Sequence, residues 1–190
     1  MNPSLPDSIL TERLLLRCWK PDDAPLLKTA IDANLAHLQP WMPWAMAEPS
    51  PLDVIAGRLE KFAADFADGV DWAYGIFTPD GDAVLGGTGA HSRIAADGLE
   101  IGYWIDAAHT RRGYATEAAA AITRIIFTLP SMQRVQIRCD PNNLASAAVP
   151  RRLGYRHLET LLGDGMTPSG MPRDTMVWEL TRAEFESRDA

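Results

Sequence analysis

The residues of this 190-residue chain with the clearest chemical potential lie in the stretch HTRRGYATEAAAA, residues His109–Ala121. Arg111, Arg112 and Gly113 stand directly before a long run of helix-forming residues. The first turn of a helix leaves backbone N–H groups without partners and carries the positive end of the helix dipole. Gly113 has no Cβ to keep an anion away from the backbone. Such a helix start can bind a phosphate, but on these residues alone we prefer the alternative of a glycine that only eases a turn beside two solvated arginines.

Two polar residues, Asn143 and Ser146, stand at the start of a second, shorter helix that the pattern predicts near residues 144–153. Asparagine is a good N-cap and serine tolerates the first turn, so capping alone would explain both. Pro150, inside this helix, removes one hydrogen bond, clashes with the carbonyl of Ser146, and costs roughly 3 kcal/mol. We therefore expect either a kink near Pro150 or an irregular first turn.

A proline-rich loop, Leu38–Pro51, concentrates aromatic residues in a segment with a shape of its own. It reads LQPWMPWAMAEPSP, and Trp41 and Trp44 each follow a proline. Aromatic bulk held in this way either forms an apolar wall over a binding site or anchors a buried loop. We favour the wall.

The elements that position these residues follow from the hydrophobic patterns. A strand is predicted at Arg13–Arg17, and helices near residues 22–37 and 52–67. The period then changes to two: WAYGIFT and AVLGGTGAHSRI predict a hairpin around Asp80 and Gly81, which Leu99–Asp106 extends as a third antiparallel strand.

The second half of the chain alternates between helices and strands. From Ala115 onward, apolar residues recur at three- and four-residue spacing, which predicts an amphipathic helix. Strands follow at Arg134–Cys139, Tyr155–Leu162 and Thr175–Leu180, with the short helix after the first of them. We predict an α/β fold of a single domain over residues 1–190, with a mixed, mostly antiparallel sheet flanked by helices.

Composition excludes several classes of partner. The formal net charge of −7 argues against direct binding of nucleic acid or of anionic membranes, because both demand a broad basic surface. The two cysteines, Cys18 and Cys139, and the N-terminal MNPSLPDSIL, which has neither a basic region nor an apolar region, argue against secretion. We expect a cytoplasmic protein with two reduced thiols.

Several motifs in fixed order resemble one family. IGYW is followed by the arginine–glycine loop, a helix, then DPNNLAS and LGY, while TERLLLR and PWMPWA precede them. The chain thereby resembles the GCN5-related N-acetyltransferases (GNAT), in particular the RimJ/RimL-type branch that acetylates N-terminal amines of ribosomal proteins. The resemblance covers nearly the whole chain. One departure concerns the loop, where Thr110 replaces the usual Arg or Gln and Arg111 replaces a frequent Gly.

The resemblance implies a splayed pair of strands holding acetyl-CoA as cosubstrate, without a metal. Asn143 would bond the pantetheine amides, and Ser146 would protonate the leaving thiolate. Trp104 and Ile105 would offer main-chain contacts near the thioester. The implied grip on the pyrophosphate comes mainly from backbone N–H groups of the loop, whose residues are Arg111, Arg112, Gly113, Tyr114, Ala115 and Thr116.

The resemblance also implies transfer of an acetyl group to a primary amine, either the N-terminal α-amine of a protein or peptide or a small-molecule amine. Glu100 is the carboxylate best placed to take the amine proton, with a solvated strand glutamate as the alternative. Glu159 or Asp164 could supply a further carboxylate, and His91 another base.

Trp41, Trp44 and His91 are the candidate contacts on the acceptor side. We expect acetyl-CoA and the amine as partners and a monomer or homodimer. A non-catalytic acyl-CoA-binding sensor of the same fold is the alternative. A simple phosphate-binding protein is less well supported, because TRRGYAT lacks the Gly-Lys-Ser/Thr ending of a P-loop.

Overall fold

The structure is a computed structural model and describes residues 5–167 and 170–188. Its centre is an eight-stranded sheet in the order β1-β2-β3-β4-β5-β6-β8-β7. Only β5 and β6 pair in parallel, so the sheet is mixed and mostly antiparallel, as predicted. The strands are β1 Ser8–Leu10, β2 Leu15–Cys18, β3 Asp71–Phe77, β4 Val84–His91, β5 Gly98–Ile105, β6 Arg134–Cys139, β7 Arg156–Met166 and β8 Pro172–Thr181.

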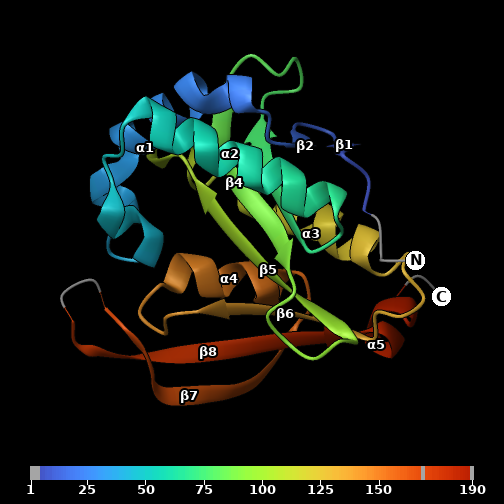
Figure 1. The fold of residues 1–190 in the computed structure, drawn as a ribbon. Coiled ribbons are helices and arrows are strands. Elements are labelled where there is room, and N and C mark those ends of the chain that lie inside the picture. The colour runs from blue at the N-terminus through green and yellow to red at the C-terminus, as the bar shows by residue number, and fades with distance from the viewer. Residues whose placement is uncertain (1–4, 168–169, 189–190) are drawn as a thin grey trace.

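Helices cover both faces of the sheet (Figure 1). They are α1 Ala24–Leu38, α2 Leu52–Ala67, α3 Tyr114–Ile126, α4 Leu144–Arg152 and α5 Arg182–Glu186, with short 3-10 helices η1 Pro21–Asp23, η2 Pro43–Ala47 and η3 Ala107–His109. The bounds of α2 and β6 match the sequence prediction. The patterns missed β1 and α5, whose three and five residues are too short for a period to emerge. Within the described residues, no helix has the length and apolarity needed to cross a bilayer.

The side chains of β3 point alternately to the two faces of the sheet and show how the sheet separates two hydrophobic cores. Trp72, Tyr74 and Ile76 pack into a cluster with α3 and α4, whereas Ala73 and Phe77 pack with α1 and α2. Successive side chains of a strand point to opposite faces, so one strand serves both layers. Burial of each large side chain contributes about 1.5–3 kcal/mol.

Several strands differ in length from their predictions, and β4, β7 and β8 differ most. The pattern extended the second hairpin strand to Ile94, but β4 ends at His91. The first of the two final strands was predicted to stop at Leu162, but β7 continues to Met166 and pairs with β8. Gly163 and Gly165 lower the strand signal of that extension, and pairing with β8 overrides it.

Candidate active site

A gap opens in the sheet where β5 and β6 diverge. The two strands pair only where Gly98–Ile101 of β5 lies beside Arg134–Ile137 of β6. On its other edge, β5 stays paired with β4 as far as Ile105. The second half of β5 therefore presents one edge of its main chain to the gap. This divergence is the splayed pair expected from the sequence.

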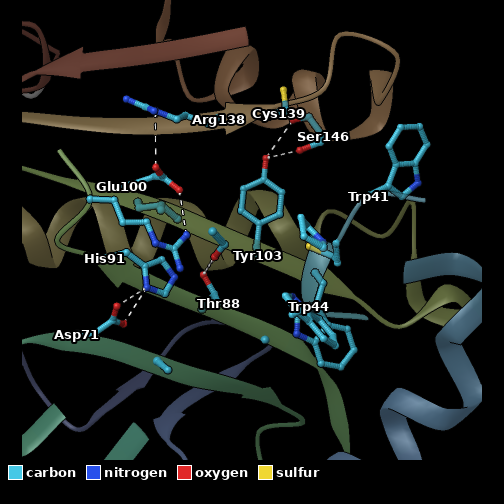
Figure 2. Close-up of a pocket in the computed structure, with 18 of the residues that line it drawn as sticks. Trp41, Trp44, Asp71, Thr88, His91, Glu100, Tyr103, Arg138, Cys139 and Ser146 are labelled. Atoms are coloured by element: carbon cyan, nitrogen blue, oxygen red, sulfur yellow. Dashed lines mark hydrogen bonds and ion pairs between the residues drawn. The ribbon is translucent and has the colours of Figure 1, made fainter. Parts of the chain in front are cut away.

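A cavity of about 1040 Å³ passes through this region and is lined by residues from both helical layers. Phe62 and Trp44 line it from the side of α1 and α2, and Asn143 and Ser146 from the side of α4. Figure 2 shows Trp44 and Ser146 among the lining residues. Two ligands could thus approach one point from opposite faces of the sheet. The predicted site residues that line this cavity are Trp41, Trp44, His91, Glu100, Trp104, Asn143, Ser146 and Asp164.

The predicted phosphate loop lies outside the lining of this cavity, at the start of α3. Gly113 occupies the N-cap position with φ 82°, and Arg111 is left-handed as well, with φ 61°. Gly113 therefore serves the left-handed backbone conformation, which glycine adopts without strain. Helical hydrogen bonding begins with the N–H of Glu117 and the carbonyl of Gly113, and no described side chain caps this end. The first N–H groups of α3 are left for a ligand.

Arg13 fixes the direction of this loop. Its Nη1 donates to the carbonyl of Arg112 at 2.9 Å, and its Nη2 lies 2.6 Å from a carboxylate oxygen of Glu117. The carbonyl and N–H of one trans peptide unit point in opposite directions. Holding the Arg112 carbonyl toward Arg13 therefore turns the N–H of Gly113 away from it. The side chains of Arg111 and Arg112 are exposed and make no ion pair with a described residue.

Glu117 anchors Arg13 as an ionised carboxylate. Burial alone would raise the pKa of Glu117, but hydrogen bonds from Thr11 and Arg13 outweigh it, so its pKa lies below the ordinary value. An acidic residue in the first turn also complements the helix dipole. The sequence prediction did not include this brace, because Arg13 and Glu117 lie far apart in the chain.

Ser146 lies at the end of the gap, where Tyr103 of β5 reaches it. The Tyr103 hydroxyl donates to the Ser146 carbonyl at 3.0 Å and lies 3.2 Å from Ser146 Oγ (Figure 2). Burial raises the pKa of Tyr103, so the phenol stays protonated at neutral pH. Asn143 accepts a hydrogen bond from the N–H of Ser146 at 3.0 Å, which is the capping role that its residue type allows.

Pro150 explains why the Ser146 carbonyl is available. In a regular helix this carbonyl would accept from the N–H of residue 150, which proline lacks. The helix α4 extends from Leu144 to Arg152 with Pro150 inside it, and the Tyr103 hydroxyl takes the missing donor's place. The proline thus converts a helical acceptor into an anchor for Tyr103.

Glu100 and His91 face each other across β4 and β5. Glu100 lies 3.2 Å from Arg93 Nη1 and 3.6 Å from Arg138 Nε. His91 Nδ1 lies 2.7 Å from a carboxylate oxygen of Asp71, its partner on β3. A carboxylate at Nδ1 fixes the imidazole tautomer that carries its proton there and leaves Nε2 as an acceptor.

The remaining candidates divide between the cavity and the surface. Asp164 lines the cavity, whereas Glu159 is exposed on β7 and does not. Ile105 is buried in the core at 8% exposure, so only its main chain faces the gap. Trp44 is 37% exposed and Trp41 is half-buried, which favours the wall over the buried anchor.

Three residues of this site were missed by sequence reasoning: Tyr103, Asp71 and Arg173, all of which line the cavity. Tyr103 stands inside IGYW, where it reads as ordinary strand core. Asp71 is the first residue of β3 but precedes the predicted strand WAYGIFT, where it resembles a turn residue. Arg173 lies in a segment of weak pattern, and only pairing with β7 brings it to the cavity.

Comparisons with known proteins agree with this geometry. Residues 13–156 match the family described as Acetyltransferase (GNAT) domain. A Bacillus subtilis (strain 168) protein named "Putative ribosomal N-acetyltransferase YdaF" is 28% identical over 179 residues, covering 93% of this chain and 96% of that protein.

Solved structures share the fold. The ribosomal L7/L12 α-N-protein acetyltransferase RimL, in complex with coenzyme A, superposes with a TM-score of 0.83 at 18% identity, over 96% of this chain and 99% of that one. The microcin C7 self-immunity acetyltransferase MccE, in complex with acetyl-CoA and AMP, gives a TM-score of 0.84 at 19% identity, over 93% and 97%.

Proposed function

This chain belongs to the GNAT acetyltransferase family, and we propose that it transfers the acetyl group of acetyl-CoA to a primary amine. The first candidate acceptor is the N-terminal α-amine of a protein or peptide, and the second is a small-molecule amine. The observation that carries the proposal is the gap between β5 and β6, with Ser146 at one end and the uncapped start of α3 nearby.

The chain offers a separate grip for each part of the cosubstrate. The N–H groups of Tyr114, Ala115 and Thr116, with Arg111 and Arg112, would bind the pyrophosphate. Asn143 and the free edge of β5 would bond the pantetheine arm in the gap. The main chain at Trp104 and Ile105 would polarise the thioester carbonyl, which favours attack by the amine.

Attack of the amine nitrogen on the carbonyl carbon forms a tetrahedral intermediate, whose C–S bond then breaks. Ser146 is the proposed proton donor to the departing thiolate and regains a proton from solvent. The Tyr103 hydroxyl donates its hydrogen bond to the Ser146 carbonyl. The phenol oxygen can therefore accept a hydrogen bond from the Ser146 hydroxyl. This contact holds the serine hydroxyl in place until sulfur, bearing negative charge, becomes the better acceptor.

For the base, contacts favour His91 over Glu100. Two guanidinium groups compete for the lone pairs of Glu100, and proton acceptance requires such a lone pair. His91, oriented by Asp71, presents Nε2 near Gly102, where a Cβ added to the glycine would lie 3.4 Å from that nitrogen. We therefore propose that His91 takes the amine proton, directly or through water.

The test is release of free thiol from acetyl-CoA with a panel of acceptors: peptides with free or blocked α-amines, a lysine side-chain amine and a polyamine. Thiol release that requires a free α-amine supports the proposal. Tight acetyl-CoA binding without turnover of any amine would instead support the sensor alternative.

A further inference from the structure

Almost every cationic side chain in the cavity is already paired with a carboxylate. The pairs are Arg58–Glu48, Lys61–Asp65, Arg93–Glu100 and Arg138–Glu100, with N–O distances of 2.7, 2.6, 3.2 and 3.6 Å. Arg173 is the exception. It lines the same cavity, yet no carboxylate of the described residues lies within 4.0 Å of its guanidinium.

The guanidinium of Arg173 is held in place without having its donors satisfied. Arg173 lies opposite Gly165 in the β7–β8 ladder, and a Cβ on Gly165 would lie 3.2 Å from Nε. The absence of that Cβ gives the guanidinium its place against the strand. Nε is buried and has no hydrogen-bond partner among the described residues, while Nη1 reaches the carbonyl of Trp41 only at 3.5 Å. A buried donor without an acceptor is unfavourable until a ligand supplies one.

Arg173 lines the same cavity as Ser146 and Cys139. Cys139 pairs with Met176 in the β6–β8 ladder, and Arg173 lies three residues before Met176 on β8. Burial raises the pKa of Cys139, and the positive charge of Arg173 acts against that rise. Trp41, whose carbonyl it approaches, belongs to the proposed acceptor wall.

We propose that Arg173 binds a carboxylate of the acceptor close to its reacting amine, so that acidic peptide N-termini are the preferred substrates. A guanidinium matches a carboxylate in geometry and can donate two parallel hydrogen bonds to it. With a net charge of −7, the chain as a whole repels acidic acceptors, so their recognition requires a local unpaired cation. The inference rests on the proposed function and specifies its acceptor.

The experiment compares acceptors that differ only in charge. Ala-Asp-Ala-amide and Ala-Asn-Ala-amide place the difference at the second residue, and Ala-Ala-Asp-amide and Ala-Ala-Asn-amide place it at the third. For at least one pair we expect the wild-type kcat/KM to favour the aspartyl peptide by about tenfold, as one charge-assisted hydrogen bond provides. Arg173→Gln should bring this ratio to about one, and Arg173→Lys should retain part of it.

Lys61→Gln is the matched control. It removes one positive charge from the cavity lining, but Lys61 is 71% exposed and already paired with Asp65. The aspartyl preference should survive in this variant. A preference lost equally in Lys61→Gln and Arg173→Gln would show a general field rather than a site and would overturn the inference.

The outcomes separate the inference from the function on which it rests. Equal acetylation of both members of each pair by the wild type overturns the role of Arg173 and leaves the acetyltransferase intact. If none of the peptides is acetylated, calorimetry with coenzyme A and the N-acetylated peptides still tests Arg173. Equal dissociation constants for the aspartyl and asparaginyl peptides then overturn it, and an aspartyl preference that Arg173→Gln abolishes supports it.

Discussion

The two ends of the proposed site are built on different principles. At the start of α3, the proposed ligand-binding groups are main-chain N–H groups, and Arg13 and Glu117 hold the neighbouring peptide unit. Around the acceptor end, the groups are side chains from the α1–α2 loop, β3, β4 and the β7–β8 hairpin. Main-chain grips tolerate changes of side chain, whereas a wall of side chains changes its specificity with each substitution. We expect binding of the cosubstrate to be robust and choice of acceptor to be adjustable.

The sharpest test of the main-chain end is Gly113→Asp, with acetyl-CoA affinity measured by calorimetry. An aspartate there would place a carboxylate where the pyrophosphate should bind and would strain a residue with φ 82°. We expect affinity to fall on the order of 1000-fold, the loss of about two charge-assisted hydrogen bonds.

Gly81→Asp is the control for that experiment, because Gly81 has the same φ of 82° and lies in the β3–β4 turn. It should show the stability cost of the backbone strain without the loss of affinity. Equal losses in both variants would mean that strain, not anion binding, explains the effect at Gly113.

Between the two ends, Ser146→Ala tests the reaction centre. If Ser146 donates a proton to the thiolate, kcat should fall about 100-fold. The thermal midpoint should change little, since the Asn143 cap bonds the N–H of Ser146 and survives the substitution. A loss of stability with near-normal kcat would restrict Ser146 to a structural role.

At the acceptor end, comparing His91→Gln with Glu100→Gln shows which of the two residues is the base. An α-amine has a pKa of roughly 7.7–8.0, and a lysine amine about 10.4. With a peptide α-amine, we expect His91→Gln to slow acetylation about tenfold at pH 7. Rising pH should recover most of the rate, because solvent then supplies the neutral amine.

The Glu100→Gln profile is the matching comparison. If the arginine pairs occupy Glu100, its pH–rate profile should run parallel to that of the wild type. The reverse result, recovery with pH in Glu100→Gln but not in His91→Gln, would return the role of base to Glu100.

The smallest effect is expected from Pro150→Ala. The new N–H can bond the Ser146 carbonyl, so Tyr103 loses part of its anchor. The helix should gain stability, up to about 3 kcal/mol, while kcat falls only a few-fold. Denaturant unfolding and turnover measured together would detect these opposite changes. A kcat equal to the wild-type value would show that the contact between Tyr103 and the Ser146 carbonyl does not support turnover.

The sequence allowed more to be predicted at the α3 end than at the acceptor end. The glycine–arginine loop and α3 are local features, so spacing alone located the helix start within a residue. The contact between Tyr103 and Ser146 joins segments 43 residues apart, and neither residue type announces it. Arg173 is distinguished by having no carboxylate partner among the described residues, which no sequence pattern reveals. β7 was predicted too short because its last residues are ordered by pairing rather than by propensity.

The gap between β5 and β6 also has a kinetic consequence. A cavity lined from both layers lets the two substrates enter from opposite faces, so neither must leave before the other arrives. The one thiol beside Ser146, Cys139, is kept in its protonated and weakly nucleophilic form because burial raises its pKa. We therefore expect direct transfer within a ternary complex, with intersecting rather than parallel double-reciprocal plots.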